Sequence, residues 1–254
     1  MIDSFKEDTM ENNKIPKIIH YCWFGRGEKP KIVKACIESW KAIMPDYEIK
    51  EWNEDNFDIN CNDFVRDAYE AKKYAFVSDY VRVYALNKYG GIYLDTDVKT
   101  LKSFDEFLYE DSFWGFEEKN FVATSTIGAA KDNEIIKMFL DSYEDKKFKI
   151  ENGQGIALTN VRAVSEILGV LGFKMDGSKQ TIEGLGTVYP QEYFSPYDYI
   201  NCVDTSTKDT VAIHYFYKSW LPYSARIKQY IKKVLVKFIG RKNLNKLREI
   251  KSAN

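Results

Sequence analysis

The stretch that decides the fold is Tyr89-Gly90-Gly91-Ile92-Tyr93-Leu94-Asp95-Thr96-Asp97-Val98. It predicts a short apolar strand that delivers two carboxylates, one residue apart, where the strand ends. Because successive strand residues face opposite sides, Asp95 and Asp97 are expected to point the same way. Two such carboxylates form a hard-oxygen site that suits Mg²⁺ or Mn²⁺. These ions usually bridge protein carboxylates and phosphate oxygens, so the stretch predicts metal-assisted chemistry on a phosphorylated substrate.

The chain before this stretch predicts a β-α-β unit. An apolar run at 17–24 predicts a first strand, and apolar residues spaced three and four apart from Pro30 to Ile43 or Met44 predict a helix. A second strand is predicted at 47–52. Strands that alternate with helices in this way favour a parallel sheet.

The following segments continue the alternation of helices and strands. Residues 64–88 predict two helices, broken near Lys72-Lys73 and stopped by Gly90-Gly91. The chain is therefore predicted to be an α/β protein with a mostly parallel central sheet flanked by helices. Its later elements are expected to be strands at 113–116, 121–127, 187–190 and 210–215, and helices at 133–143 and 157–171.

Composition excludes several classes of protein. The chain has 254 residues, of which 44% are hydrophobic and 30% charged, as in ordinary soluble proteins. No apolar run reaches the roughly 20 residues that span a bilayer. The four cysteines form no Cys-x-x-Cys pair, and only two histidines occur, which disfavours zinc or redox chemistry. A cytoplasmic location is expected, without a nucleic-acid partner.

The two ends differ from the body of the chain. Residues 1–13 are polar and acidic and predict a disordered leader, whereas 14–223 are expected to form one domain. From Arg226 onward the chain carries ten Lys and Arg against Glu249 alone. The tail at 224–254 predicts a basic amphipathic helix, which could bind the anionic inner face of a membrane through 226–251. An ordinary terminal helix packed on the body is the alternative.

Further residues with chemical potential lie outside the two aspartates. Asp79 and Arg82 share one face of an otherwise apolar predicted helix, so either they meet a polar ligand or they form a surface ion pair. Trp23 follows the first strand at the carboxyl edge, where its indole could stack on a nucleobase or belong to the core. His214 follows a late strand and could complete a Mn²⁺ site or be a core histidine.

Together these segments resemble glycosyltransferase family 32, the DxD-containing sugar transferases. The same central block resembles the catalytic core of the large clostridial glucosylating toxins. The resemblance covers roughly residues 15–130 and 210–222. It rests on Ile15-Pro16-Lys17-Ile18-Ile19-His20 with Trp23 and Gly25, Ser39-Trp40-Lys41, Pro45-Asp46-Tyr47-Glu48, the block from Ala75 to Val98, and His214 with Ser219-Trp220.

The resemblance implies a GT-A type, Rossmann-like fold and an enzyme that uses a nucleotide-sugar donor with Mn²⁺ or Mg²⁺. The donor would be a UDP-sugar, with GDP-mannose as a second option. The reaction would move a hexose or N-acetylhexosamine, with retention, to a glycan or lipid-linked glycan acceptor. Bacterial surface or capsular polysaccharide synthesis would be the setting. The segment 153–159 lacks a proline that many relatives carry there, so the acceptor stays open.

The resemblance also implies a role for each site residue. Asp95 would contact the ribose and the metal, and Asp97 would bind the metal directly, with His214 as a further ligand. Trp23 would stack on the base of the donor, and Asp79 and Arg82 would hold its sugar hydroxyls. Tyr93 would touch the donor, and Trp220 would close over the diphosphate.

Two other functions remain open from the residues alone. A haloacid-dehalogenase-like phosphatase could use the Asp95/Asp97 pair, although its motif normally lies on the first strand, and here two β-α elements precede it. A sugar-binding module without catalysis is the third reading.

Overall fold

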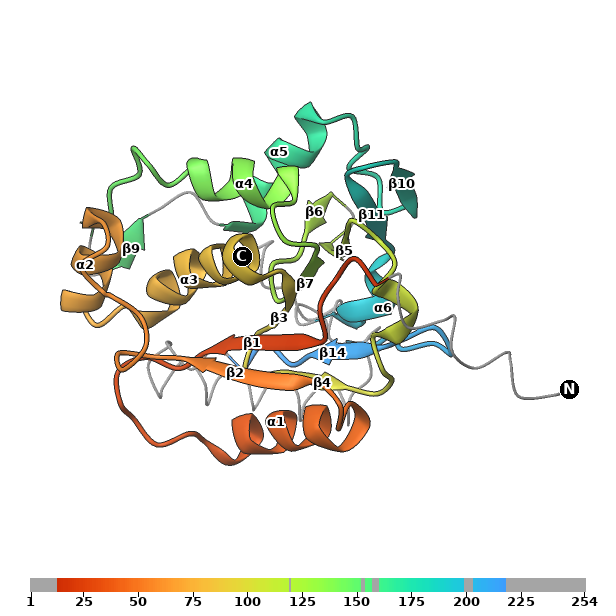
Figure 1. Cartoon of the computed structure of the whole chain (residues 1–254), viewed down its shortest axis with the longest axis horizontal. Coiled ribbons are helices and arrows are strands. Elements are labelled where there is room, and N and C mark those ends of the chain that lie inside the picture. Colours follow the sequence, from red (N-terminus) through yellow and green to blue (C-terminus); the bar gives the residue numbers. More distant parts are fainter. Residues whose placement is uncertain (1–12, 119, 152–153, 157–159, 199–202, 218–254) are drawn as a thin grey trace, which may run out of the picture.

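One central sheet organises the computed structural model (Figure 1). Its main path has the strand order β10-β11-β5-β7-β3-β1-β2, and β6 pairs with β5 outside this path. Strands β2, β1, β3, β5 and β11 run in one direction, whereas β7 and β10 run in the opposite one. The predicted mostly parallel sheet is therefore confirmed, with a reversed strand, β7, near its centre.

The structure describes residues 13–118, 120–151, 154–156, 160–198 and 203–217. The predicted leader up to residue 12, Trp220 and the predicted tail at 224–254 lie outside the described residues. No helix within the described ranges is long and apolar enough to cross a membrane.

The helices are α1 (Lys31–Ile43), α2 (Asp63–Glu70), α3 (Tyr74–Tyr89), α4 (Glu134–Asp141), α5 (Asn160–Val170) and α6 (Gln191–Phe194), with a 3-10 turn at Asp105–Phe107. The strands are β1 (Ile18–Cys22), β2 (Glu48–Trp52), β3 (Gly91–Leu94), β4 (Val98–Thr100), β5 (Ser112–Glu118), β6 (Phe121–Val122), β7 (Thr126–Ala129), β8 (Lys149–Glu151), β9 (Gln154–Ile156), β10 (Gln180–Ile182), β11 (Gly186–Tyr189), β12 (Tyr197–Asp198), β13 (Val203–Asp204) and β14 (Ala212–His214).

Helices cover both faces of the sheet, and each face has its own core. Helix α1 lies on one side, and α2, α3, α4 and α5 lie on the other (Figure 1). Alternate residues of β3 serve the two cores: Ile92 and Leu94 pack on the α1 side, and Tyr93 packs on the α3 side. All three are no more than 1% exposed, so this strand is buried on both faces, as a central strand requires.

The junction between α3 and β3 depends on Gly90 and Gly91. Both have positive φ, at 66° and 101°, a conformation that L side chains rarely adopt. A Cβ on Gly91 would lie 2.7 Å from the carbonyl oxygen of Ile18 in β1. The glycine pair therefore ends the helix, as predicted, and also lets β3 lie directly against β1.

The buried side chain of His20 stabilises the same junction through two hydrogen bonds. The Nε1–H of Trp52 donates to Nδ1 of His20 at 3.2 Å, which leaves Nε2–H of His20 to donate to the Gly90 carbonyl at 2.9 Å. His20 is 0% exposed, and burial is the main reason why its pKa is lowered to about 4. This histidine is therefore a neutral structural residue.

Two predictions about the strands were wrong. The predicted strand at 121–127 is two strands, because β6 pairs with the carboxyl-terminal half of β5 whereas β7 moves on to pair with β3. The aspartates do not lie on β3, which ends at Leu94. They lie in a tight turn, closed by a hydrogen bond from the amide of Val98 to the carbonyl of Asp95 at 2.9 Å. The turn, and not strand alternation, sets their direction.

A separate two-stranded ladder connects this turn to the distant end of the domain. Strand β4 pairs antiparallel with β14, and Val98 is opposite His214. The indole N–H of Trp40 in α1 donates to the Val98 carbonyl at 2.8 Å, which anchors the ladder on α1. The pairing places His214 beside the two aspartates.

Candidate active site

The site lies at the carboxyl edge of the sheet, where open α/β sheets bind ligands. Strands β1 and β3 are parallel and in register, with His20 opposite Tyr93, so Trp23 and Asp95 emerge at the same edge. The amide of Asp95 donates to the carbonyl of Ser125 at 2.8 Å, at the start of the reversed strand β7. The turn that carries the aspartates is thus attached to the start of β7.

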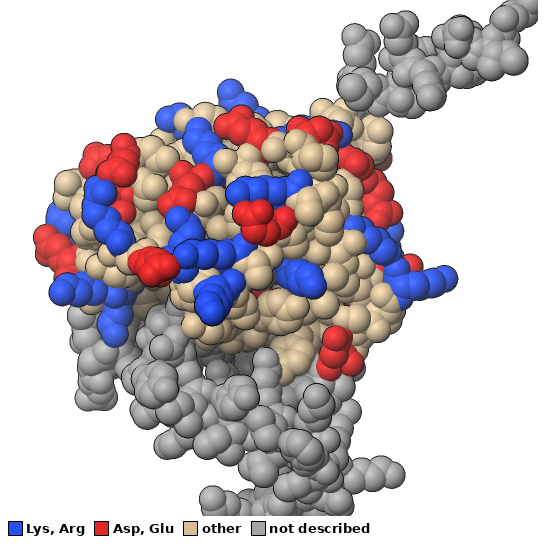
Figure 2. Space-filling view, turned by 90° about the horizontal axis from the view of Figure 1, so that it is seen from below, with Lys and Arg blue, Asp and Glu red and all other residues tan. Residues whose placement is uncertain are grey.

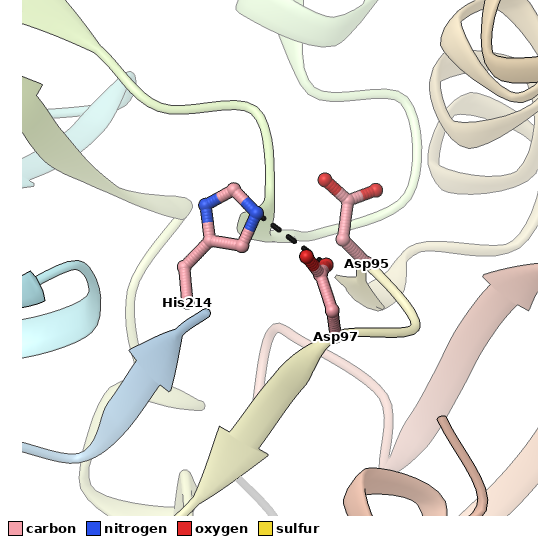
Figure 3. A group of neighbouring side chains, drawn as sticks. All are labelled: Asp95, Asp97 and His214. Carbon is pink, nitrogen blue, oxygen red and sulfur yellow. Dashed lines mark ion pairs between the residues drawn. The ribbon is translucent and has the colours of Figure 1, made fainter. Parts of the chain in front are cut away.

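Asp95, Asp97 and His214 converge on one point (Figure 3). One ligand atom from each lies within 4.8 Å of the other two, and Nε2 of His214 is 3.4 Å from Oδ1 of Asp97. Two carboxylates and an imidazole form a donor set that Mn²⁺ accepts. All three residues are only partly exposed, so the carboxylates repel each other at short range unless a cation lies between them. These residues fit a divalent metal ion.

The two carboxylates of the cluster stabilise a positive charge beside them, on His214 or on a bound cation. Burial by itself would lower the pKa of His214, but Asp97 and then Asp95 outweigh it and raise that pKa to about 9. Burial opposes ionisation of Asp97, and the neighbouring His214 overcomes it and lowers the pKa of this carboxyl. In the metal-free protein an imidazolium therefore supplies the positive charge that the two carboxylates require.

Arg82 forms the second half of the site. Its Nη2 is 2.9 Å from Oδ1 of Asp79 and 3.3 Å from Oδ1 of Asp95. Its Nη1 donates to the carbonyl and the hydroxyl of Thr124 at 2.6 and 2.9 Å. The side chain is 6% exposed, so the surface ion pair considered from the sequence is excluded. Arg82 instead joins α3 to the turn that carries Asp95 and Asp97.

Asp79 is held beside Arg82 in an environment that disfavours its charge. Burial raises its pKa to about 6, with Asp95 adding to the effect and Arg82 opposing it. Its side chain is still 24% exposed, so the carboxyl reaches the site opening. The backbone carbonyl of Asp79 accepts a hydrogen bond from Nδ2 of Asn160 at 3.0 Å, and Asn160 accepts in turn from the hydroxyl of Tyr143.

Tyr93 contacts both Asp95 and Arg82. Its hydroxyl donates to Oδ1 of Asp95 at 2.9 Å, and its ring centroid lies 4.7 Å from the guanidinium carbon of Arg82. The residue is 1% exposed, so its observed contacts are with protein groups.

Trp23 lies apart from this cluster, directly after β1. Its indole N–H donates to the Gly27 carbonyl at 2.7 Å, which fixes the ring against the following loop. It borders a depression of about 250 Å³, whose other lining residues include Lys29, Glu51 and Asn53. A flat ring beside a partly open depression can accept a planar base.

Sequence reasoning missed Thr124 and Asn160. Both contact the Asp79–Arg82 pair, although they are 42 and 81 residues away from their partners. No sequence signal marked Thr124 or Asn160: Asn160 lay inside the helix predicted at 157–171, and in the structure it is the first residue of α5. The site thus brings together every described residue predicted for the metal and the sugar, with Trp23 at the same edge.

Comparisons with known proteins identify the family of the chain. A family model of capsular polysaccharide synthesis proteins matches residues 1–148, more than half of the chain. Inositol phosphoceramide mannosyltransferase 3 of Schizosaccharomyces pombe is 29% identical over 149 residues, 53% of this chain and 41% of that protein. Subversion of eukaryotic traffic protein A of Legionella pneumophila is 27% identical over 163 residues, 52% of this chain and 25% of that protein. The chain spans less than half the length of these relatives.

Solved structures show distant likenesses. The PaToxG glycosyltransferase has a TM-score of 0.47 and 20% identity, with coverage of 62% of this chain and 70% of that one. A glycosyltransferase involved in glycosylation of the major capsid of PBCV-1 has a TM-score of 0.46 and 13% identity, with coverage of 84% and 98%.

The family match confirms the resemblance to glycosyltransferases that was drawn from the sequence. The chain belongs to the family of capsular polysaccharide synthesis proteins.

Proposed function

We propose that the protein is a metal-dependent, retaining glycosyltransferase that moves a hexose or N-acetylhexosamine from a nucleotide-sugar to a glycan acceptor. The convergence of Asp95, Asp97 and His214 carries this proposal. Two of these residues were expected from one short stretch, but the third arrives through the β4–β14 ladder. An accidental surface cluster of acids would not include a buried imidazole from so distant a segment.

The three residues would hold Mn²⁺ or Mg²⁺. Such an ion neutralises the charge that develops on a departing nucleoside diphosphate, which removes the need for a general acid. The protein groups supply orientation. Arg82 fixes the position of Asp95, and the amide of Tyr217 donates to Oδ2 of Asp97 at 2.7 Å, so neither carboxylate is free to turn away.

The donor would lie across the carboxyl edge of the sheet. Trp23 would stack on its base. Asp79 with Arg82 would hold sugar hydroxyls: the part-exposed carboxyl of Asp79 would accept from them, and the buried guanidinium of Arg82, whose N–H groups face Ser78, Thr124, Asp79 and Asp95, would hold that carboxyl in place. Tyr93 would act on the donor through Asp95. Trp220 would cover the diphosphate, and it lies outside the described residues. A UDP-sugar is the first donor to test, and GDP-mannose is the second.

The acceptor would be a glycan or a lipid-linked glycan, in bacterial surface or capsular polysaccharide synthesis. Membership of the capsular polysaccharide synthesis family supports the setting, and the similarity to an inositol phosphoceramide mannosyltransferase supports a lipid-linked acceptor. Binding of an anionic membrane by residues 226–251 would serve such an acceptor. This part of the proposal rests on the sequence, since the segment lies outside the described residues.

A thermal-shift panel of UDP-, GDP- and dTDP-sugars, with and without Mn²⁺, tests the proposal. A donor at about 100 times its Kd stabilises a chain of this size by about 3 kcal/mol, or about 5 °C or more. We expect one donor to give such a shift only with the metal. No shift with any donor would refute the donor site.

Asp97→Asn provides the matching activity test. We expect at least about a hundredfold loss of transfer with the fold intact, because charge neutralisation at the diphosphate is lost. Asp176→Asn is the control, since Asp176 is exposed and bonds only to nearby groups in its own turn. Activity retained in Asp97→Asn would remove the metal argument. Hydrolysis of p-nitrophenyl phosphate by the wild type would favour the phosphatase alternative.

A further inference from the structure

Asp97 is held by one short segment of the chain. The amide of Tyr215 donates to the backbone carbonyl of Asp97 at 3.1 Å, and the amide of Tyr217 donates to Oδ2 of the same residue at 2.7 Å. Oδ1 of Asp97 faces Nε2 of His214 (Figure 3). A single aspartate thus receives three contacts from residues 214–217.

This arrangement requires an unusual backbone at Phe216. In an extended strand, amides two residues apart are separated by about 7 Å, too far to converge on one aspartate. Phe216 has a φ of 51°, which turns the chain and allows both amides to reach Asp97. A bulky residue with positive φ is a true outlier, and such strain persists only where the surroundings enforce it.

The side chain of Phe216 explains why a phenylalanine occupies this strained position. Its ring centroid lies 3.9 Å from that of His214, with an angle of 35° between the rings, and the residue is only 9% exposed. Nδ1 of His214 is buried and has no hydrogen-bond partner among the described residues. Within the described residues the imidazole is therefore not oriented by the usual carboxylate or carbonyl on its second nitrogen, and the Phe216 ring packs directly against it.

We propose that Phe216 is a positioning residue for the metal site. Its ring holds the imidazole of His214 in the orientation that points Nε2 at Asp97, and its left-handed backbone places two amides on Asp97. The inference rests on the proposed metal site and adds a residue that does not bind the metal. Removing the ring should weaken metal binding without touching any ligand.

Binding of Mn²⁺ to the full chain, without nucleotide, measures the effect. In Phe216→Ala we expect the Kd for Mn²⁺ to rise about 10- to 100-fold, the range seen when groups behind metal ligands are removed. Phe216→Gly removes the ring and suits the positive φ, so it should show the same loss. Phe216→Tyr keeps the ring and should remain within about threefold of the wild type.

Phe57→Ala is the matched control. Phe57 is 8% exposed and contacts other rings, Trp52 and Tyr84 among them, so its removal leaves a similar cavity away from the metal ligands. It should lower the melting temperature and leave the Kd for Mn²⁺ unchanged. An unchanged Kd in Phe216→Ala, or a wild-type Kd in Phe216→Gly, would overturn the role of the ring.

The two histidines make NMR a direct second test, which does not depend on a variant folding. In the metal-free wild type, the imidazole protons of His214 should show cross-relaxation with the Phe216 ring, and Mn²⁺ should broaden the signals of His214 selectively, that is, at a lower ratio of metal to protein than those of His20. Absence of cross-relaxation overturns this inference alone. Absence of selective broadening overturns both the inference and the proposed metal site.

Discussion

The two histidines of the chain lie in two buried regions, and burial has opposite outcomes in them. His20 joins β1, β2 and the α3–β3 junction, and its pKa falls to about 4. His214 stands beside Asp95 and Asp97, and its pKa rises to about 9. Burial is the largest single contribution in both cases, and it lowers the pKa in both. Only the neighbours differ.

The neighbours separate a structural region from a functional one. Around His20, a tryptophan N–H and a glycine carbonyl satisfy both ring nitrogens, and the nearby charge is that of Lys50. Around His214, carboxylates lie close together and one ring nitrogen has no partner among the described residues. A buried nitrogen without a partner and clustered carboxylates cost stability, and such costs are typical of functional sites. Burial of a histidine is therefore not a mark of function, whereas unbalanced charge around it is.

The largest effect should follow from removing the cation of the functional region. Arg82→Met leaves the carboxylates of Asp79 and Asp95 without their partner, and we expect a loss of about 3 to 5 kcal/mol in the free energy of unfolding. Lys50→Met is the matched change in the structural region. Lys50 lies over the rings of Tyr89 and Trp52, so its loss should cost about 1 kcal/mol or less. Equal losses in urea denaturation would contradict the distinction between the regions.

The acid side of the stability profile should report on His20. Its folded pKa of about 4 lies below the ordinary value of 6.5, so the unfolded chain binds a proton first as the pH falls. The stability present above pH 6.5 is therefore lost between pH 6.5 and 4, by about 3 kcal/mol in total. His20→Asn should be less stable at pH 7.5 and should lose less on acidification.

NMR titration of the metal-free protein separates the two histidines directly. We expect one imidazole to titrate near pH 4 and the other near pH 9. Two signals that both titrate near pH 6.5 would break the comparison, since neither environment would then act on its histidine.

The next effect tests the backbone of the structural region. Gly91→Ala should cost about 2 to 3 kcal/mol, because the new Cβ meets the Ile18 carbonyl at 2.7 Å and the φ of 101° is unfavourable. Gly184→Ala has a φ of 79° and nothing within 4 Å, so it should cost about 1 kcal/mol from the conformation alone. The difference between the two in urea denaturation measures the close approach of β3 to β1. Equal costs would mean that the strands can move apart.

The smallest effect should come from Tyr93→Phe. It removes the hydroxyl that donates to Asp95, with an expected loss of about 1 kcal/mol in stability and a severalfold weaker affinity for the donor. Tyr189→Phe removes a comparable hydroxyl, which donates to Glu110 away from the site. We expect the control to lose stability without any change in donor affinity, measured by calorimetry. A Tyr93→Phe variant with unchanged donor affinity would show that the hydroxyl of Tyr93 is not needed to position Asp95.

Much of the first half of the chain was predictable, because its signals are local. The β-α-β start, the break near Lys72 and the stop at Gly90 follow from apolar spacing and from residues that tolerate positive φ. The sequence also marked Asp95, Asp97 and Arg82 as candidates, since charged residues embedded in apolar elements are costly without a partner, although a surface ion pair stayed open for Arg82.

The sequence by itself thus determined the order of the elements and which side chains could carry chemistry. The tertiary structure decided how those side chains meet. Local periodicity predicts none of three features: the reversed direction of β7, the turn that orients Asp95 and Asp97, and the contacts of Thr124 and Asn160. Tyr217 reaches Asp97 across 120 residues, next to the β4–β14 ladder, whose strand β4 is itself bonded to α1 through Trp40. Pairing over such a separation is set by packing of the whole domain, which no short segment encodes.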